Sequence, residues 1–265
     1  MAFNRFKRSR RPSARKTRKT RKTYTRKSSK VSTPVKNYVN RMIHNNTENK
    51  VFAGYGVNQT LSSAFGTLSG TQALYLLPQI SQGVGQHLRI GNEIKIRKAY
   101  IRGYVNILPY SLGVNARPAP VMVKMWVVSF KTINTALIAS CPTANFFEAG
   151  SSSTGFQANM LDMVLSTNND LITVHRTKTF KIGASSVSTG VPVASYYDNS
   201  SFNHYFNFEY GSKCKGTIKY NDTTTNVPEN KNMWLLFQVV YPDGSSDAGS
   251  VAEYHYTCRV EYEDA

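Results

Sequence analysis

The sequence is poor in cysteine and contains no long apolar run. Its three cysteines, Cys141, Cys214 and Cys258, lie far apart, so they match neither a metal-ligand spacing nor a disulfide framework, and structural thiols in a reducing compartment are expected. No run of eighteen apolar residues exists, so no membrane insertion is expected. No apolar stretch follows the basic start, which argues against a secretory signal.

Catalytic motifs are also absent. The chain has no G-x-S-x-G elbow, Walker loop, CxxC or HExxH, and Cys141 precedes a proline without a local partner. The five histidines are not at metal-ligand spacing. His204 with Glu209 and His255 with Glu253 are the only raw material for a metal site, and the opposite parity of His204 and Glu209 places them on opposite faces of a regular strand. We therefore expect no enzyme, no catalytic residue, no metal and no cofactor.

Acidic residues are missing from the first thirty positions, which hold fourteen of the 33 basic residues. This segment supplies +14 of the formal charge of +18, and the remaining residues, with 19 basic and 15 acidic side chains, carry only +4. The protein is therefore a nearly neutral body with a cationic arm. The basic residues of the arm are Arg5, Lys7, Arg8, Arg10, Arg11, Arg15, Lys16, Arg18, Lys19, Arg21, Lys22, Arg26, Lys27 and Lys30.

The arm has Thr and Ser between its charges and no apolar face at either helical or strand period. It cannot bury enough apolar surface to offset its ordering entropy, so residues 1–34 are expected to be disordered alone. Neutralising a polyanion releases counterions, and tight, salt-sensitive nucleic-acid binding without sequence preference is predicted. The same residues match a nuclear localisation signal. A solubilising tail is the plainer alternative, but the charge is too dense for it.

The remainder divides into a short linker and one β domain. Val35, Tyr38, Val39, Met42 and Ile43 have helical spacing, so a helical linker over 35–50 is predicted. The β domain is predicted over 51–265, beginning with one edge strand and loops over 51–80.

The first long strand changes its apolar phase. Ile94 and Ile96 alternate with basic residues, and the apolar positions then shift to Ala99 and every second residue up to 107, which predicts a β-bulge near Lys98. Two runs, 121–131 and 233–241, are apolar almost throughout and predict strands buried on both faces.

Further strands are predicted over 171–183, 202–210, 215–220 and 251–262. The first of these is expected to present Ile172, Val174, Arg176, Lys178, Phe180 and Ile182 on one side. Single helical turns are predicted over 144–149 and 160–165. About eight strands with almost no helix indicate an all-β protein with a single antiparallel sandwich, either immunoglobulin-like or a jelly roll. Long strands and long connections favour an eight-stranded jelly roll.

Basic residues on the first long strand extend the electrostatic argument to the body. Lys95, Arg97, Lys98 and Arg102 are predicted to contact nucleic acid, and the interleaved Tyr100 and Tyr104 have the chemistry to stack on bases. The alternative is an exposed strand face with packed tyrosines, and the residues alone do not separate the two.

The basic arm and three later motifs together resemble one protein family. Gln82-Gly83 followed by Arg89-Ile90-Gly91-Asn92-Glu93-Ile94 resembles the QG…R-x-G-x-x-I pattern of capsid proteins from circular Rep-encoding single-stranded DNA viruses, the circovirus-like group. The passages 218–244 and 174–182 are similar to that family's "KYN, polar loop, P-x-N, apolar strand" passage and its central strand. The arm here is rich in Lys and Thr as well as Arg, so no genus or host is assigned.

The resemblance implies a viral capsid protein whose jelly roll self-assembles, as about sixty copies, into a T=1 icosahedral shell. It also implies a circular single-stranded DNA genome held by the arms, with Lys95, Arg97, Lys98 and Arg102 on the inner surface. A virion location, passage through the host nucleus, a nuclear import receptor and an unidentified cell-surface receptor follow from it as expectations. A non-viral nucleic-acid-binding or chaperone-like β-sandwich is the alternative, and a carbohydrate-binding or cupin-type domain is a third.

Overall fold

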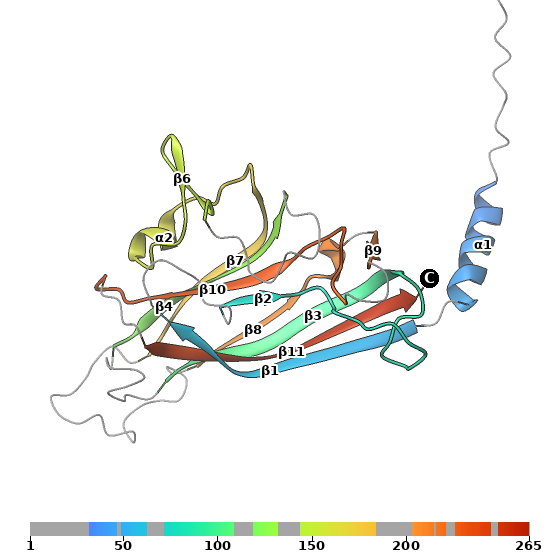
Figure 1. Ribbon diagram of the computed structural model, residues 1–265, viewed down its shortest axis with the longest axis horizontal. Coiled ribbons are helices and arrows are strands. Elements are labelled where there is room, and N and C mark those ends of the chain that lie inside the picture. Colours follow the sequence, from blue (N-terminus) through green and yellow to red (C-terminus); the bar gives the residue numbers. More distant parts are fainter. Residues whose placement is uncertain are drawn as a thin grey trace, which may run out of the picture. The chain divides into compact units, whose positions relative to one another are not determined.

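The computed structural model of the protein describes nine ranges of the chain: 32–46, 49–62, 72–108, 119–131, 144–183, 203–214, 216–220, 226–244 and 249–264 (Figure 1). The chain forms two compact units, residues 1–45 and 46–265. In the first, the described element is the helix α1 (Thr33–Asn46). The second unit is built almost entirely of strands.

Two antiparallel sheets form the body. Sheet A has the order β1 (Asn49–Ser62), β11 (Ser250–Asp264), β3 (Glu93–Ile107) and β8 (Asn203–Glu209), with β9 (Thr217–Lys219) also paired to β3. Sheet B has the order β2 (Ala73–Tyr75), β10 (Trp234–Val240), β4 (Val121–Phe130) and β7 (Ile172–Ile182). A hairpin of β5 (Phe147–Ala149) and β6 (Ser152–Thr154), the helix α2 (Met160–Val164) and the short 3-10 helix η3 (Gly211–Lys213) complete the described elements.

The strands pair in a nested order. Strand β1 pairs with β11, β2 with β10, β3 with β8 and β4 with β7, all antiparallel. The first of these eight strands thus pairs with the last, the second with the second from last, and so on inwards to β4 and β7. Strand β9, which pairs with β3, lies outside this nested set. The predicted all-β antiparallel sandwich is confirmed, and the described residues contain eleven strands, of which nine form the two main sheets and two form the hairpin of β5 and β6.

The predicted bulge in β3 is confirmed. Lys98 pairs with Glu261 of β11 and Ile96 pairs with Tyr262, so Arg97 is the extra residue. Because of this insertion, Ile96 and Ala99 both face the core while Arg97 and Lys98 are both exposed. The core between the sheets continues through the inward side chains of β10 and β11. Glycine at position 103 lets β3 lie close to its neighbours, because a Cβ there would clash with the carbonyl oxygen of His255.

Sheet B is also covered on its outer face, which confirms that β4 and β10 are buried on both sides. A second apolar cluster lies there, and Trp126 is at its centre with Phe146, Phe147 and Phe156 at ring-centroid distances of 5.6–6.1 Å. The helical turn predicted over 144–149 is wrong, because residues 147–149 form β5. The turn predicted over 160–165 is confirmed as α2, whose first backbone N–H groups are capped by the side chain of Asn159.

The face assignment along β7 is partly wrong. Val127 of β4 pairs with Arg176 and Val128 pairs with Val174, so His175 is an extra residue in the strand. The insertion reverses the alternation, and Ile172 belongs to the outer cluster while Phe180 and Ile182 belong to the core between the sheets.

The beginning of the body differs slightly from the expected boundary. Helix α1 ends at Asn46 and β1 begins at Asn49, so residues 49 and 50, predicted as part of the helical linker, belong to the strand. Strand β1 is an edge strand of sheet A, as expected, and β2 is a short edge strand of sheet B. The Lys50 ammonium is buried against Asp264, with 3.0 Å between its Nζ and a carboxylate oxygen, and this ion pair joins the start of β1 to the end of β11.

Candidate nucleic-acid interface

The fourteen basic residues predicted to bind nucleic acid in the arm, from Arg5 to Lys30, lie outside the described residues. The body contributes a second set of candidate residues on the outer face of sheet A.

All four basic residues predicted on β3 are exposed on this face. Lys95 and Lys98 extend into solvent, and the guanidinium carbon of Arg102 lies 4.8 Å from the ring centroid of Tyr100. No described carboxylate lies within ion-pair distance of these three cations. Their charge is therefore available to an anionic ligand.

Arg97, the fourth predicted residue, has a different environment. Its guanidinium forms an ion pair with Glu263 of β11, whose side chain is 7% exposed. This pairing ties the bulge of β3 to the end of the neighbouring strand. Arg97 thus stabilises the sheet, and its charge is largely matched by its partner.

An aromatic pocket lies on the same face, across β1, β3, β8 and β11. It has a volume of about 660 Å³ and is lined by Tyr55, Tyr104, Tyr205 and His255, among others. Tyr55 is 77% exposed and Tyr205 is 70% exposed, so their rings meet solvent. Tyr104 stacks on His255, with 4.7 Å between ring centroids and 18° between ring planes, and it contacts Tyr205 at 5.8 Å. Exposed aromatic rings at this spacing form a platform on which unpaired bases can stack.

A hydrogen-bond network fixes the histidine of this platform. Nε2 of His255 lies 3.1 Å from Oε1 of Glu253, which also accepts a hydrogen bond from the side-chain amide of Asn106 at 3.0 Å. Partial burial acts to raise the pKa of Glu253, but these hydrogen bonds outweigh it, and the pKa lies below its usual value. Glu253 is therefore an ionised acceptor that anchors the side chains of His255 and Asn106.

A basic pocket adjoins the aromatic one. It has a volume of about 420 Å³ and is lined by Lys98, Arg102, Arg176 and Asn207, together with Tyr100, Phe208 and Glu209. Arg102 and Asn207 also line the aromatic pocket, so the two are continuous. An arrangement of three cations beside an aromatic platform suits a nucleotide, whose base and phosphate need these two environments.

Arg176 is a site residue that the sequence pattern did not identify. It comes from β7, the edge strand of sheet B, and its guanidinium carbon lies 5.8 Å from the ring centroid of Phe208 on β8. The sequence does contain a signal for Arg176, because this cation has the same parity in its strand as apolar residues. Such a position indicates a side chain whose charged end leaves the core at the edge of a sandwich. Tyr205 was also detectable from the sequence pattern, but by the opposite signal. Its parity in the strand differs from that of Phe206 and Phe208, which are buried, so its ring is expected on the solvent side.

His204 and His175 serve packing. His204 stacks on Phe180 with 3.9 Å between ring centroids, and burial, aided by the charge of Lys178, lowers its pKa. His175 contacts the hydroxyl of Ser129 at 2.8 Å, and burial followed by the charge of Lys213 lowers its pKa. Within the described ranges, no group of three or more His, Cys, Asp or Glu side chains has the arrangement of a metal site.

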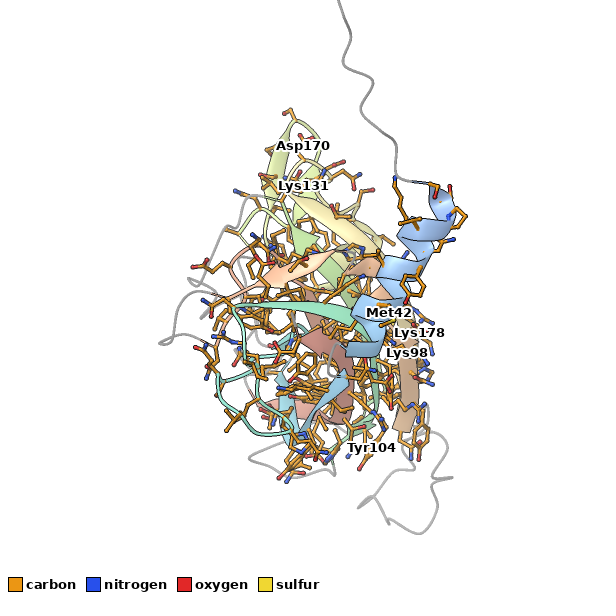
Figure 2. The ribbon with its side chains drawn as sticks, turned by 90° about the vertical axis from the view of Figure 1, so that its right-hand side faces the viewer. Met42, Lys98, Tyr104, Lys131, Asp170 and Lys178 are labelled. Atoms are coloured by element: carbon orange, nitrogen blue, oxygen red, sulfur yellow. The ribbon has the colours of Figure 1, made fainter. Side chains whose placement is uncertain are left out.

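Figure 2 shows how the labelled side chains are distributed over the body. Tyr104 lies near the lower end of the molecule in this view, whereas Lys131 and Asp170 lie at its upper end. Lys131, exposed beyond the end of β4, thus provides a cation remote from the aromatic pocket.

Comparisons with known proteins place the chain in no family, since no family model and no curated protein matches it.

Proposed function

We propose that this protein is a viral capsid protein that self-assembles into an icosahedral shell of about sixty copies and packages circular single-stranded DNA. The observation that carries the proposal is the combination of a nested eight-strand sandwich with an acid-free basic arm directly before its first helix and strand.

The strand order supports the jelly-roll part of this proposal. The nested pairs β1–β11, β2–β10, β3–β8 and β4–β7 have the order expected when a long antiparallel hairpin is rolled into two four-stranded sheets. An immunoglobulin-like sandwich distributes its strands differently between the sheets. Jelly rolls occur in viral capsids, lectins and cupins, so the fold alone does not distinguish these functions.

The distribution of charge favours the capsid among them. Sixty arms would bring about 840 positive charges into one shell, which is comparable with the phosphates of a small genome. A lectin or cupin has no need of such an arm. The outer face of sheet A adds Lys95, Lys98 and Arg102 as further cations, and Arg176 from the edge of sheet B joins Lys98 and Arg102 in the basic pocket, so the body adds to the positive charge that the arm provides.

The two pockets of sheet A support a single-stranded cargo. Stacking on Tyr104 and Tyr205 requires bases whose faces are free, and a duplex hides these faces within its own stack. We propose that the aromatic pocket takes an unpaired base and that the basic pocket takes a neighbouring phosphate.

The proposal extends to the infected cell. The arm would serve as a nuclear localisation signal recognised by a host import receptor, and assembly would take place in the host nucleus. The mature protein would reside in the virion, which would engage a cell-surface receptor.

A non-viral nucleic-acid-binding or chaperone-like protein is the second candidate. Size-exclusion chromatography of the full chain separates them, since shells elute in the excluded volume and a chaperone-like protein elutes as a monomer or small oligomer.

A further inference from the structure

Helix α1 carries an apolar stripe that is open to solvent. Val35, Tyr38, Val39 and Met42 recur at the spacing of one helical face, and their exposed fractions are 49%, 64%, 47% and 42%. Pro34 stands in the first turn, where its missing N–H is not needed by the helix. The sequence thus forms a helix that has four large, solvent-exposed apolar side chains along one face.

Nucleic-acid binding does not account for this stripe, because phosphates are bound by charge and hydrogen bonds. The charge of the sequence around the helix indicates which kind of partner the stripe binds. Residues 1–47 contain sixteen Lys and Arg and no Asp or Glu, and α1 itself includes Lys36 and Arg41. The stripe therefore belongs to a strongly cationic segment, whose partner must be apolar and negatively charged at once.

A second copy of this chain does not meet that requirement. Residues 48–265 contain 17 basic and 15 acidic side chains, a net charge of +2, and the first 47 residues are uniformly cationic. An anionic lipid surface meets it directly, because acyl chains accept the apolar side chains while the headgroups attract Lys and Arg.

We propose that the N-terminal unit binds the surface of anionic bilayers, with α1 lying in the interface and its Val35–Met42 stripe turned towards the acyl chains. Fourteen residues of helix extend about 21 Å, which is shorter than the apolar core of a bilayer. None of the described helices has the length and apolarity to cross a membrane. The helix therefore lies on the membrane, and the basic arm supplies the second, electrostatic contribution that stable peripheral binding requires.

This inference also predicts a competition. The arm binds nucleic acid and anionic lipid through the same cations, so oligonucleotide should release the protein from vesicles as the arm is neutralised. The apolar stripe separates the two ligands, since it contributes to lipid binding alone.

The test is flotation of the nuclease-treated full chain with phosphatidylcholine vesicles that contain or lack phosphatidylserine. The variant Val39→Gln/Met42→Gln removes half of the stripe and keeps residues of good helix propensity. The control Asn37→Gln changes an exposed residue on the opposite side of the same helix. Circular dichroism of each chain with and without vesicles reports the helix, and oligo-dT binding reports the arm.

We expect the wild-type chain and Asn37→Gln to float only with vesicles that contain phosphatidylserine. The double variant should bind these vesicles at least about tenfold more weakly than the wild-type chain. Oligo-dT binding should be the same in all three chains. Equal flotation of the wild-type chain and the double variant would overturn the proposal, because charge alone would then explain binding. A double variant that instead loses self-association and keeps its vesicle binding would overturn it too, and would assign the stripe to a second copy.

Discussion

The guanidinium carbon of Arg89 lies 4.7 Å from the ring centroid of Tyr220, and both side chains are buried. Arg89 is completely inaccessible and donates to the carbonyl oxygens of Ile80 and Gly91 at 3.1 and 2.8 Å. These two residues belong to two of the motifs, Q-G…R-x-G and K-Y-N, that carry the resemblance to a capsid family. The motifs therefore meet in space, and their local role is to fix the loop of residues 81–92.

Replacing Arg89 by Met should destabilise the body by about 3–5 kcal/mol, because several buried carbonyl groups lose their donor. Lys at this position should rescue only part of the loss, since an ammonium cannot reproduce the planar fork of hydrogen bonds. Chemical denaturation of the full chain measures both values.

The control for this prediction is Arg259→Met. Arg259 pairs with Glu261 at 3.3 Å on the surface, where its side chain is 49% exposed. Its loss should cost less than about 1 kcal/mol. Equal costs for Arg89→Met and Arg259→Met would contradict a structural role for the buried guanidinium.

The two described cysteines should be unreactive in the folded protein. Burial raises the pKa of the Cys214 thiol to about 11, and it also raises the pKa of Cys258, so thiolate is scarce at neutral pH. In a Cys141→Ser background, iodoacetamide at about pH 8 should label neither thiol in the native protein and both in urea. Rapid labelling of native protein, followed by mass spectrometry of the peptides, would show that this part of the core opens readily.

The network around His255 should make stability dependent on pH in the acid range. The folded pKa of Glu253 is below its usual value of 4.5, so the ionised carboxylate stabilises the fold above that value. This contribution is lost as the pH falls through the folded pKa. Glu253→Gln should therefore flatten the decrease in stability below about pH 5, by less than about 1 kcal/mol for this partly solvated group.

Asn106→Ala offers a second test of the same network, because it removes the amide that donates to Glu253. It should also reduce the acid dependence, and thermal unfolding across the pH range measures it. A wild-type profile retained in both variants would exclude Glu253 as the responsible group.

The nucleic-acid interface should have a stacking component that persists at high salt. Tyr104→Ala and Tyr205→Ala should each weaken oligo-dT binding by about 1–3 kcal/mol, and high salt suppresses the contribution of the arm. Arg102→Gln and Arg176→Gln should each reduce the slope of log affinity against log salt by about 0.7, as expected for one lost phosphate contact with a single strand.

Lys131→Gln is the matched control, because this exposed cation is remote from Tyr104 (Figure 2). Fluorescence anisotropy of labelled oligo-dT measures all five variants. If Lys131→Gln and Arg102→Gln have the same effect, binding is a property of net charge and sheet A holds no specific interface.

The sequence predicted the bulge of β3 because its outer face meets solvent, so the phase jump from Ile96 to Ala99 is visible in the polar pattern. The bulge at His175 was missed for the opposite reason. Ile172 and Phe180 have the same parity but pack in clusters on opposite faces of sheet B, and a strand with apolar neighbours on both sides hides a change of face. Short apolar runs are similarly ambiguous, and for this reason the sequence of the run that contains Phe146 and Phe147 predicts a helical turn where the structure has a strand.

The candidate site was only half predictable. Lys98 and Arg102 were identifiable because they alternate with core residues on one strand, and Tyr104 follows the same phase. Arg176 could not be joined to them, because β7 and β8 are edge strands of different sheets and their proximity depends on the complete topology. Arg97 resembles its neighbours in sequence, and only the position of Glu263 shows that it is paired.

Negative-stain microscopy of the purified full chain, with the absorbance ratio at 260 and 280 nm taken on the same fraction, tests the proposed function most directly. The proposal predicts uniform round shells whose ratio is that of a nucleic-acid complex. A small monodisperse species that forms no shells at any salt concentration or pH would contradict it, and would favour a nucleic-acid-binding protein of the chaperone-like kind.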